Sequence, residues 1–127
     1  MATTLNQITI GSKVSSKRIE ITYESGDQNK LAAETSGRSI DQIKIDNTAG
    51  TADVYLRLYD VASGSVTLGT TVPDAIFPCA AGETADYTFH PSNAWATAIT
   101  VNLTTSTAAA SYNAVTWTAY VTLLTSA

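Results

Sequence analysis

Apolar and polar residues alternate along several short segments of the chain, most clearly over residues 115–123 and 99–104. Alternation with a period of two is typical of a β-strand, because successive side chains point to opposite faces of a sheet. In the first segment Val115, Trp117 and Val121 share one face, which is predicted to lie in a core. The opposite face is rich in threonine and is predicted to meet solvent or a partner.

The same pattern predicts about eight strands, separated by turn signals every 8–12 residues or so. The expected strands comprise residues 5–10, 18–23, 43–45, 53–59, 75–78, 84–89, 98–104 and 115–123. Prolines bracket residues 75–78, so that strand is expected at a sheet edge. The polar segment 24–38 is predicted to be a surface loop with at most one helical turn at residues 30–34, and residues 91–94 are predicted to be a turn.

These elements predict an all-β, single-domain antiparallel β-sandwich. Jelly-roll and immunoglobulin-like topologies both fit the pattern. We expect residues 17–127 to form the sandwich domain and residues 1–16 to form either a first strand or an N-terminal arm that lies on a neighbour. A chain of 127 residues is expected to be one domain and to bury a core without disulfides or metals.

Composition narrows the classes of function. Charged residues make up 14% of the chain, against about 25% in typical domains, and so weakly charged a surface suits contact with other proteins. The net charge is −4 and no basic stripe exists, so no nucleic-acid partner is expected. No apolar run approaches the roughly 20 residues that span a membrane. Residues 1–6 lack the features of a signal peptide, which predicts synthesis and folding in a cytoplasm.

Candidate catalytic and zinc-binding residues are few. His90 is the only histidine and Cys79 the only cysteine, whereas a zinc site needs three or four such ligands and a hydrolytic triad needs a nucleophile beside its histidine. His90 is expected in an exposed turn, and Cys79 is expected to be a buried thiol. Gly64 and Gly69 have the spacing of a phosphate loop, but Thr70 stands where that loop requires lysine. We therefore expect no enzyme, no cofactor and no resident metal.

A calcium site remains an alternative, because aspartates follow or precede several predicted strands. They are Asp41, Asp46, Asp53 and Asp60. No calcium-loop motif joins them, so such a site would depend on the fold pooling their carboxylates.

Tyr55, Arg57 and Tyr59 alternate on one strand and share a face. Tyrosine and arginine are enriched at interface hot spots, so this face is a candidate platform for a protein or a sugar. The alternative is a second buried layer beneath a neighbouring strand or loop. By its phase in the last strand, Tyr120 is expected on the same face, and the four residues are the predicted interface.

The stretch from Asp53 to Thr105 resembles small β-rich structural proteins of tailed bacteriophages, especially head-decoration (cement) proteins. The segments that carry the resemblance are Val54 to Asp60, Gly69 with Pro73, Ile76 to Pro78, Ala81 to Thr84, Tyr87 to Phe89 and Ile99 to Thr104. The resemblance implies a virion protein without catalytic residues that binds the outer surface of the capsid, usually as a homotrimer, and bridges subunits of the major capsid protein.

Three hypotheses of function follow. The first is a capsid decoration protein that stabilises a phage head as a homo-oligomer. The second is another virion part, such as a neck, tail or fibre-base module. The third is a carbohydrate-binding sandwich that uses Tyr55, Tyr59 and Trp95.

Overall fold

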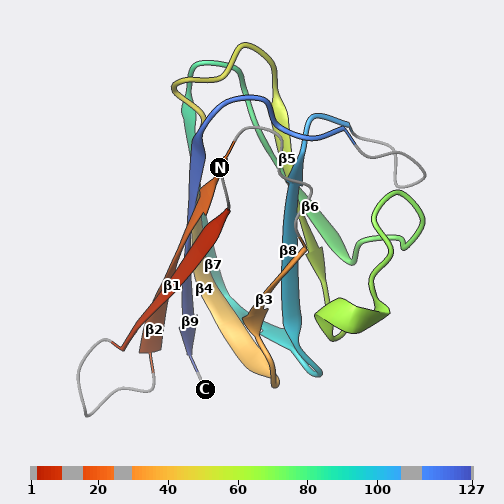
Figure 1. The fold of residues 1–127 in the computed structure, drawn as a ribbon. Coiled ribbons are helices and arrows are strands. Elements are labelled where there is room, and N and C mark those ends of the chain that lie inside the picture. The colour runs from red at the N-terminus through yellow and green to blue at the C-terminus, as the bar shows by residue number, and fades with distance from the viewer. Residues whose placement is uncertain (1–2, 10–15, 25–29, 107–112, 127) are drawn as a thin grey trace.

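The computed structural model describes residues 3–9, 16–24, 30–106 and 113–126, which form two facing sheets (Figure 1). The strands are β1 (Thr4–Thr9), β2 (Ser16–Tyr23), β3 (Leu31–Glu34), β4 (Arg38–Asp46), β5 (Val54–Tyr59), β6 (Ala75–Cys79), β7 (Thr84–Trp95), β8 (Ile99–Thr104) and β9 (Ala119–Ser126). A short 3-10 helix, η1 (Ser63–Ser65), lies between β5 and β6. No helix in the described ranges is long and apolar enough to cross a membrane.

The strand order resolves the two topologies left open by the sequence. One sheet has the order β1-β2-β9-β4-β7 and the other the order β3-β8-β5-β6, and each strand pairing is antiparallel. From β2 onward the chain crosses between the sheets at each connection except the one from β5 to β6. This is the order of a jelly roll, in which β1 adds a ninth strand beside β2. The predicted all-β sandwich is confirmed.

The core lies between the sheets and is built from the inward side chains of the alternating strands. Ile19 and Ile21 on β2, Val121 and Leu123 on β9, and Leu56 on β5 are each at most 1% exposed. Burying one such aliphatic side chain contributes roughly 1.5–3 kcal/mol. The predicted phase of the last strand is confirmed, although the strand begins at Ala119. Trp117 precedes it, is half-buried and packs against the core.

Residues 31–34 correct the loop predicted for 24–38, because they form β3. This strand pairs with β8 and has a register shift between Ala32 and Glu34. Ala and Glu have low strand propensity, so no local signal marks the strand. The tertiary structure overrides that propensity by burying Ala33 and Glu34.

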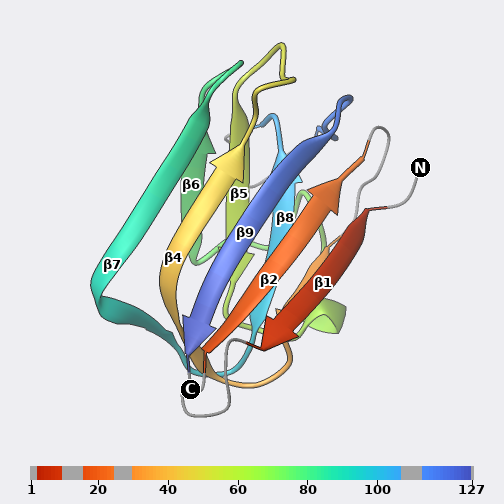
Figure 2. The same ribbon diagram turned by 90° about the vertical axis from the view of Figure 1, so that its left-hand side faces the viewer.

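Residues 91–94 also differ from the prediction, because β7 continues through the expected turn. Thr88 pairs with Gln42 and Asn93 with Ile40, so residues 89–92 stand opposite Asp41 alone. This irregularity coincides with the bend in β7 in Figure 2. Proline within the strand is tolerated because β7 is an edge strand. The predicted edge position of residues 75–78 is confirmed, since β6 ends the four-stranded sheet.

Candidate interaction surface

Loops of the same chain cover the outer face of the four-stranded sheet over β8 and most of β5. All six side chains of β8 are buried, whereas a strand with one solvent face buries alternate residues. The loop from β5 to β6 passes over this side of the sheet (Figure 1), and Thr100 Oγ1 donates to the Val61 carbonyl at 2.7 Å. Between β8 and β9, the Asn113 carbonyl accepts from Thr104 Oγ1 at 2.9 Å. The outward threonines of β8 therefore bind the backbone of the loops that cover them.

Arg57 and Tyr59 lie in this covered face, and each is 0% exposed. Nη2 of Arg57 donates to the Ser106 carbonyl at 2.9 Å. The alternative of a second buried layer therefore describes these two residues, while Tyr55 beside them is half-buried. The expectation that Tyr120 shares their face is wrong, because β9 belongs to the five-stranded sheet.

The carbohydrate hypothesis required three aromatic rings on one platform. Two of them are enclosed, since Tyr59 is 0% and Trp95 5% exposed. A sugar stacks on the exposed face of a ring, so this part of the fold offers no such platform.

The outer face of the five-stranded sheet carries the outward side chains of β1, β2, β9, β4 and β7, and we call it the open face. The strand registers align these side chains in three cross-strand rows. In the order of the strands the rows are Thr4, Thr22, Tyr120, Asp46 and Thr84; Asn6, Glu20, Thr122, Lys44 and Asp86; and Ile8, Arg18, Leu124, Gln42 and Thr88.

Figure 2 looks onto this sheet, and no described element lies in front of it. Tyr120 is 51% exposed, and the side chains of Arg18 and Glu20 are 49% and 46% exposed. A tyrosine at the middle strand of a threonine-rich sheet supplies area that a protein partner can bury at low entropic cost.

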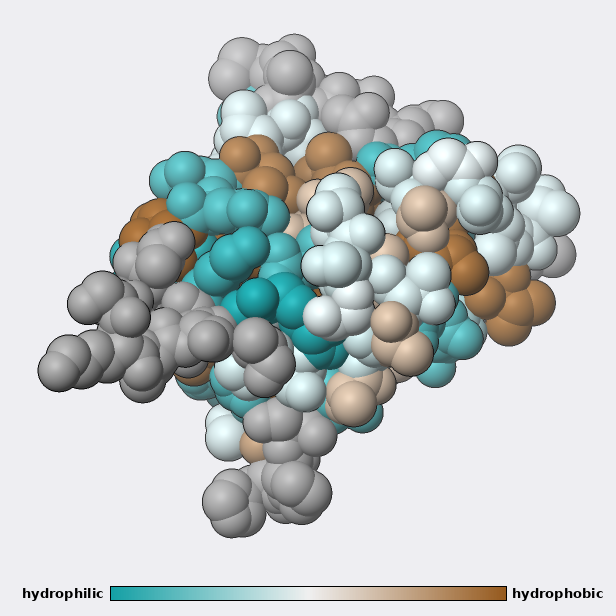
Figure 3. Space-filling model, turned by 90° about the horizontal axis from the view of Figure 1, so that it is seen from below, coloured by the Kyte–Doolittle hydropathy of each residue, from teal (hydrophilic) through white to brown (hydrophobic). Residues whose placement is uncertain are grey.

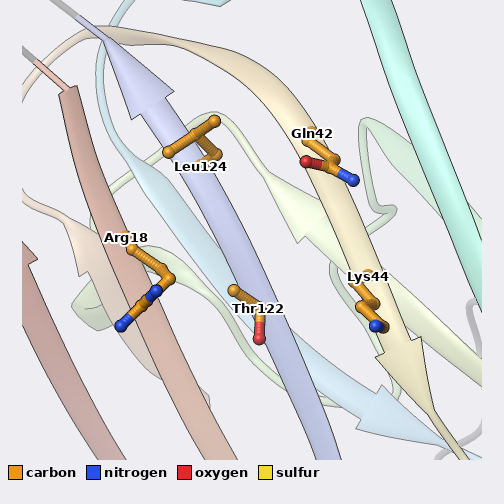
Figure 4. A pocket seen from close by; sticks show the side chains of 5 residues that line it. All are labelled: Arg18, Gln42, Lys44, Thr122 and Leu124. Atoms are coloured by element: carbon orange, nitrogen blue, oxygen red, sulfur yellow. The ribbon is translucent and has the colours of Figure 1, made fainter. Parts of the chain in front are cut away.

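Two shallow hollows indent the open face on either side of Thr122. The first, of ≈ 270 Å³, is lined by Arg18, Gln42, Lys44, Thr122 and Leu124. Figure 4 shows Arg18 and Lys44 on opposite sides of Thr122. The second, of ≈ 350 Å³, includes Glu20 and Tyr120 in its lining. One hollow thus presents cations and the other a carboxylate, which suits a partner surface with both signs of charge.

The ionic groups of the open face are weakly engaged within the chain. Arg18 Nε lies 3.9 Å from Glu20 Oε2, a separation at which an exposed pair contributes little. Asp46 is the exception, because it accepts from the hydroxyl of Thr48 at 2.7 Å and from its N–H at 3.0 Å. These hydrogen bonds, hydroxyl first, and the charge of Lys44 lower the pKa of Asp46 despite an opposing effect of burial.

Asn47 joins the loops at the upper end of the sandwich, a role that the sequence did not indicate. Its side-chain amide is fully buried and donates to the carbonyls of Ala52 and Ala80 at 3.0 and 3.1 Å. Its Oδ1 accepts from Trp117 Nε1 at 2.7 Å. The end of β4 is thereby tied to the loop before β9, with every polar group of the amide satisfied.

Asp60 organises the turn from β7 to β8 at the lower end. Its carboxylate accepts from the backbone N–H groups of Ala96, Thr97 and Ala98 at 3.1, 2.8 and 3.2 Å. Burial raises the pKa of Asp60, but the three hydrogen bonds together outweigh it and hold the pKa below its ordinary value. Asp74 in turn accepts from the Asp60 N–H at 2.6 Å.

Hydrophilic residues cover the middle of this lower end (Figure 3). A hollow of ≈ 210 Å³ there is lined by Asp60, Asp74, Asn93 and Trp95, among others. Because the Asp60 carboxylate already binds three backbone N–H groups, its first role is to hold the turn.

A buried ion pair joins the sheets beside β1 and β3. The carboxylate of Glu34 is 4% exposed and pairs with Arg38 and, at 3.5 Å, with Lys17 Nζ. Gln7 Nε2 reaches across from β1 to the Ala33 carbonyl at 2.7 Å. No pattern in the sequence identifies this group, because its members come from four separate strands.

The four aspartates of the calcium hypothesis are dispersed. Besides Asp46 and Asp60, Asp53 Oδ1 accepts from the Ala81 N–H at 3.0 Å and Asp41 Oδ1 from Ser126 Oγ at 3.2 Å. Over the described part of the chain, no group of three or more His, Cys, Asp or Glu residues could hold a metal ion.

Cys79 is buried, and its Sγ lies 3.3 Å from the Glu83 carbonyl. Desolvation is the largest cause that raises the pKa of this thiol, so it is a packing group. The side chain of His90 lies outside the described residues.

Comparison with models of known protein families gives no match, and no curated protein sequence matches the chain.

Proposed function

We propose that this protein is a structural subunit of a bacteriophage particle, a decoration (cement) protein that binds the outer surface of the head. The observation that carries the proposal is the open face, which no described element covers, whereas loops cover β8 and most of β5 on the other outer face. The protein would contribute binding area rather than chemistry, with the major capsid protein and further copies of itself as partners.

A bridging protein needs contact surfaces on more than one side. Opposite the open face, Val72 is 73% and Ile76 40% exposed, both on the side of the four-stranded sheet. Exposed apolar side chains of this size favour contact with protein. The net charge of −4 suits the outer surface of a head rather than its DNA-filled interior.

The jelly roll adds support by analogy only. Viral capsid proteins share this architecture, but so do lectins and cupins, and a fold does not determine a function. Support for the proposal therefore comes from the surfaces, and the expected homotrimer on the capsid remains part of the proposal.

The protein would stabilise the shell through thermodynamic linkage between binding and assembly. A protein that binds the assembled shell and not its dissociated subunits stabilises the shell by mass action. Purified protein should therefore bind expanded capsids that lack it and raise the temperature at which they release DNA. If capsids neither bind the protein nor gain heat resistance, the proposal is wrong.

A neck, tail or fibre-base module would use the same kind of surface. Cryo-electron microscopy of the particle separates these locations, because density at quasi-threefold shell sites supports decoration and density in a ring or spike supports the alternative.

A further inference from the structure

The charges at the centre of the open face are arranged symmetrically about β9. Glu20 on β2 and Lys44 on β4 both stand in the row of Thr122, one strand to either side of it. β9 is the middle strand of the five. A negative and a positive charge are therefore placed at equal distances from the midline of the face.

We propose that the open face binds the open face of a second copy of this chain, across a two-fold axis that runs along β9. This rotation places β2 of one copy over β4 of the other and leaves β9 over β9. Glu20 then faces Lys44 of the partner subunit, and Lys44 faces Glu20 of the partner subunit. One isologous contact thus forms the same ion pair twice.

The residues on the axis fit the centre of such an interface. Tyr120 and Leu124 flank Thr122 on β9, so each would meet its own counterpart. Tyr120 is 51% exposed in the single chain, and its burial would supply the aromatic centre typical of interfaces. At the margin of the interface, Asn6 would face Asp86 of the partner subunit, so that the amide of Asn6 could donate to that carboxylate.

The charges also exclude the other in-plane two-fold axis. An axis across the strands at the middle row would place Glu20 against Glu20 of the partner subunit and Lys44 against Lys44 of the partner subunit. Like charges at both positions disfavour that arrangement. Aligned packing of twisted sheets at roughly 30° keeps the central strands in register, and these strands carry both ion pairs.

The area of the open face suits a dimer that dissociates on dilution. Five strands about 4.8 Å apart and three rows about 6.8 Å apart define a face of about 500 Å² per copy, or about 1,000 Å² in total. This lies near the lower limit for specific complexes, about 1,200 Å². The inference rests on the proposed contact between copies of this protein and does not require a capsid. It replaces the expected homotrimer by a two-fold dimer and leaves the side of Val72 and Ile76 for a capsid.

Charge reversal tests the pairing. Sedimentation velocity over a concentration series would compare the wild-type protein with Glu20→Lys, Lys44→Glu and the double variant. We expect a wild-type dimer, at least about tenfold weaker association for each single variant, and recovery in the double variant, whose ion pairs are restored with reversed sign. An equimolar mixture of the two single variants should form a heterodimer, because all its cross-axis pairs are attractive.

Glu83→Lys is the matched control, since it makes the same change of charge at an exposed position outside the three rows of the open face. It should leave association unchanged. A wild-type monomer throughout the series, or a trimer or other oligomer that the single variants do not weaken, would overturn the proposal, as would single variants that neither the double change nor mixing rescues. A dimer that passes these tests but binds no capsid would refute the decoration proposal alone.

Discussion

The two sheets of this sandwich have similar inner faces and very different outer ones. On β8, in the four-stranded sheet, all six side chains are buried, whereas on β9, in the five-stranded sheet, buried and more exposed side chains alternate. The difference comes from the connections, because the loop after β5 and the segment after β8 hydrogen-bond to the outward threonines of β8. The same polar residue type therefore anchors a loop on one sheet and forms an open surface on the other.

The largest predicted difference in stability is between alanine variants of two tyrosines, one on each outer face. Tyr59→Ala removes a fully buried ring from the covered face and should lower the free energy of unfolding by about 3–5 kcal/mol. Tyr120→Ala removes a ring from the open face and should change it by less than about 0.5 kcal/mol. Urea denaturation of dilute protein measures both. Equal losses of unfolding free energy in the two variants would show that the two outer faces are equally buried.

The two arginines give the same contrast at smaller scale. Arg57→Ala deletes a buried side chain that donates to the Ser106 carbonyl, and we expect a loss of about 2–4 kcal/mol. Arg18→Ala makes the identical change on the open face and should cost less than about 0.5 kcal/mol. If denaturation midpoints rank Arg18→Ala below Arg57→Ala, the assignment of covered and open faces is reversed.

The hydrogen bond between Trp117 and Asn47 tests how the segment between β8 and β9 is held. Trp117→Phe keeps most of the ring but leaves Asn47 Oδ1 without its donor, so we expect a loss of about 1–2 kcal/mol. Asn47→Asp in the same assay should also destabilise, because it removes the amide donors to Ala52 and Ala80. No loss in Trp117→Phe would mean that packing alone holds the segment.

The smallest effect concerns Asp60 and depends on pH. Its folded-state pKa is lowered, so its stabilisation is fully present above the unfolded pKa of about 3.9 and is lost as the pH falls through the folded value. Asp60→Asn should therefore cost about 1 kcal/mol at neutral pH, and the difference from wild type should shrink below about pH 4. A difference that stays constant down to pH 2 would contradict this role.

Much of the fold could be predicted from alternation, and the candidate site only in part. The phase of residues 119–123 and the edge position of residues 75–78 agree with the structure. β3 could not be predicted, because residues 31–34 lack strand propensity and pair only through contacts with β8. Arg57 and Tyr59 resembled an interface because the pattern shows which side chains point outward, but not whether a loop lies over them.

The sequence by itself determined most of the strands, their inward residues and the scarcity of groups for catalysis, because side-chain direction along a strand is a local property with a period of two. The tertiary structure decided the jelly-roll order, the extent of β7 and which outer face is open. These depend on contacts between distant residues, such as the bond from Arg57 to Ser106. The placement of Glu20 and Lys44 about β9 is likewise a property of strand order, since β2, β9 and β4 are neighbours in the sheet but not consecutive in the chain.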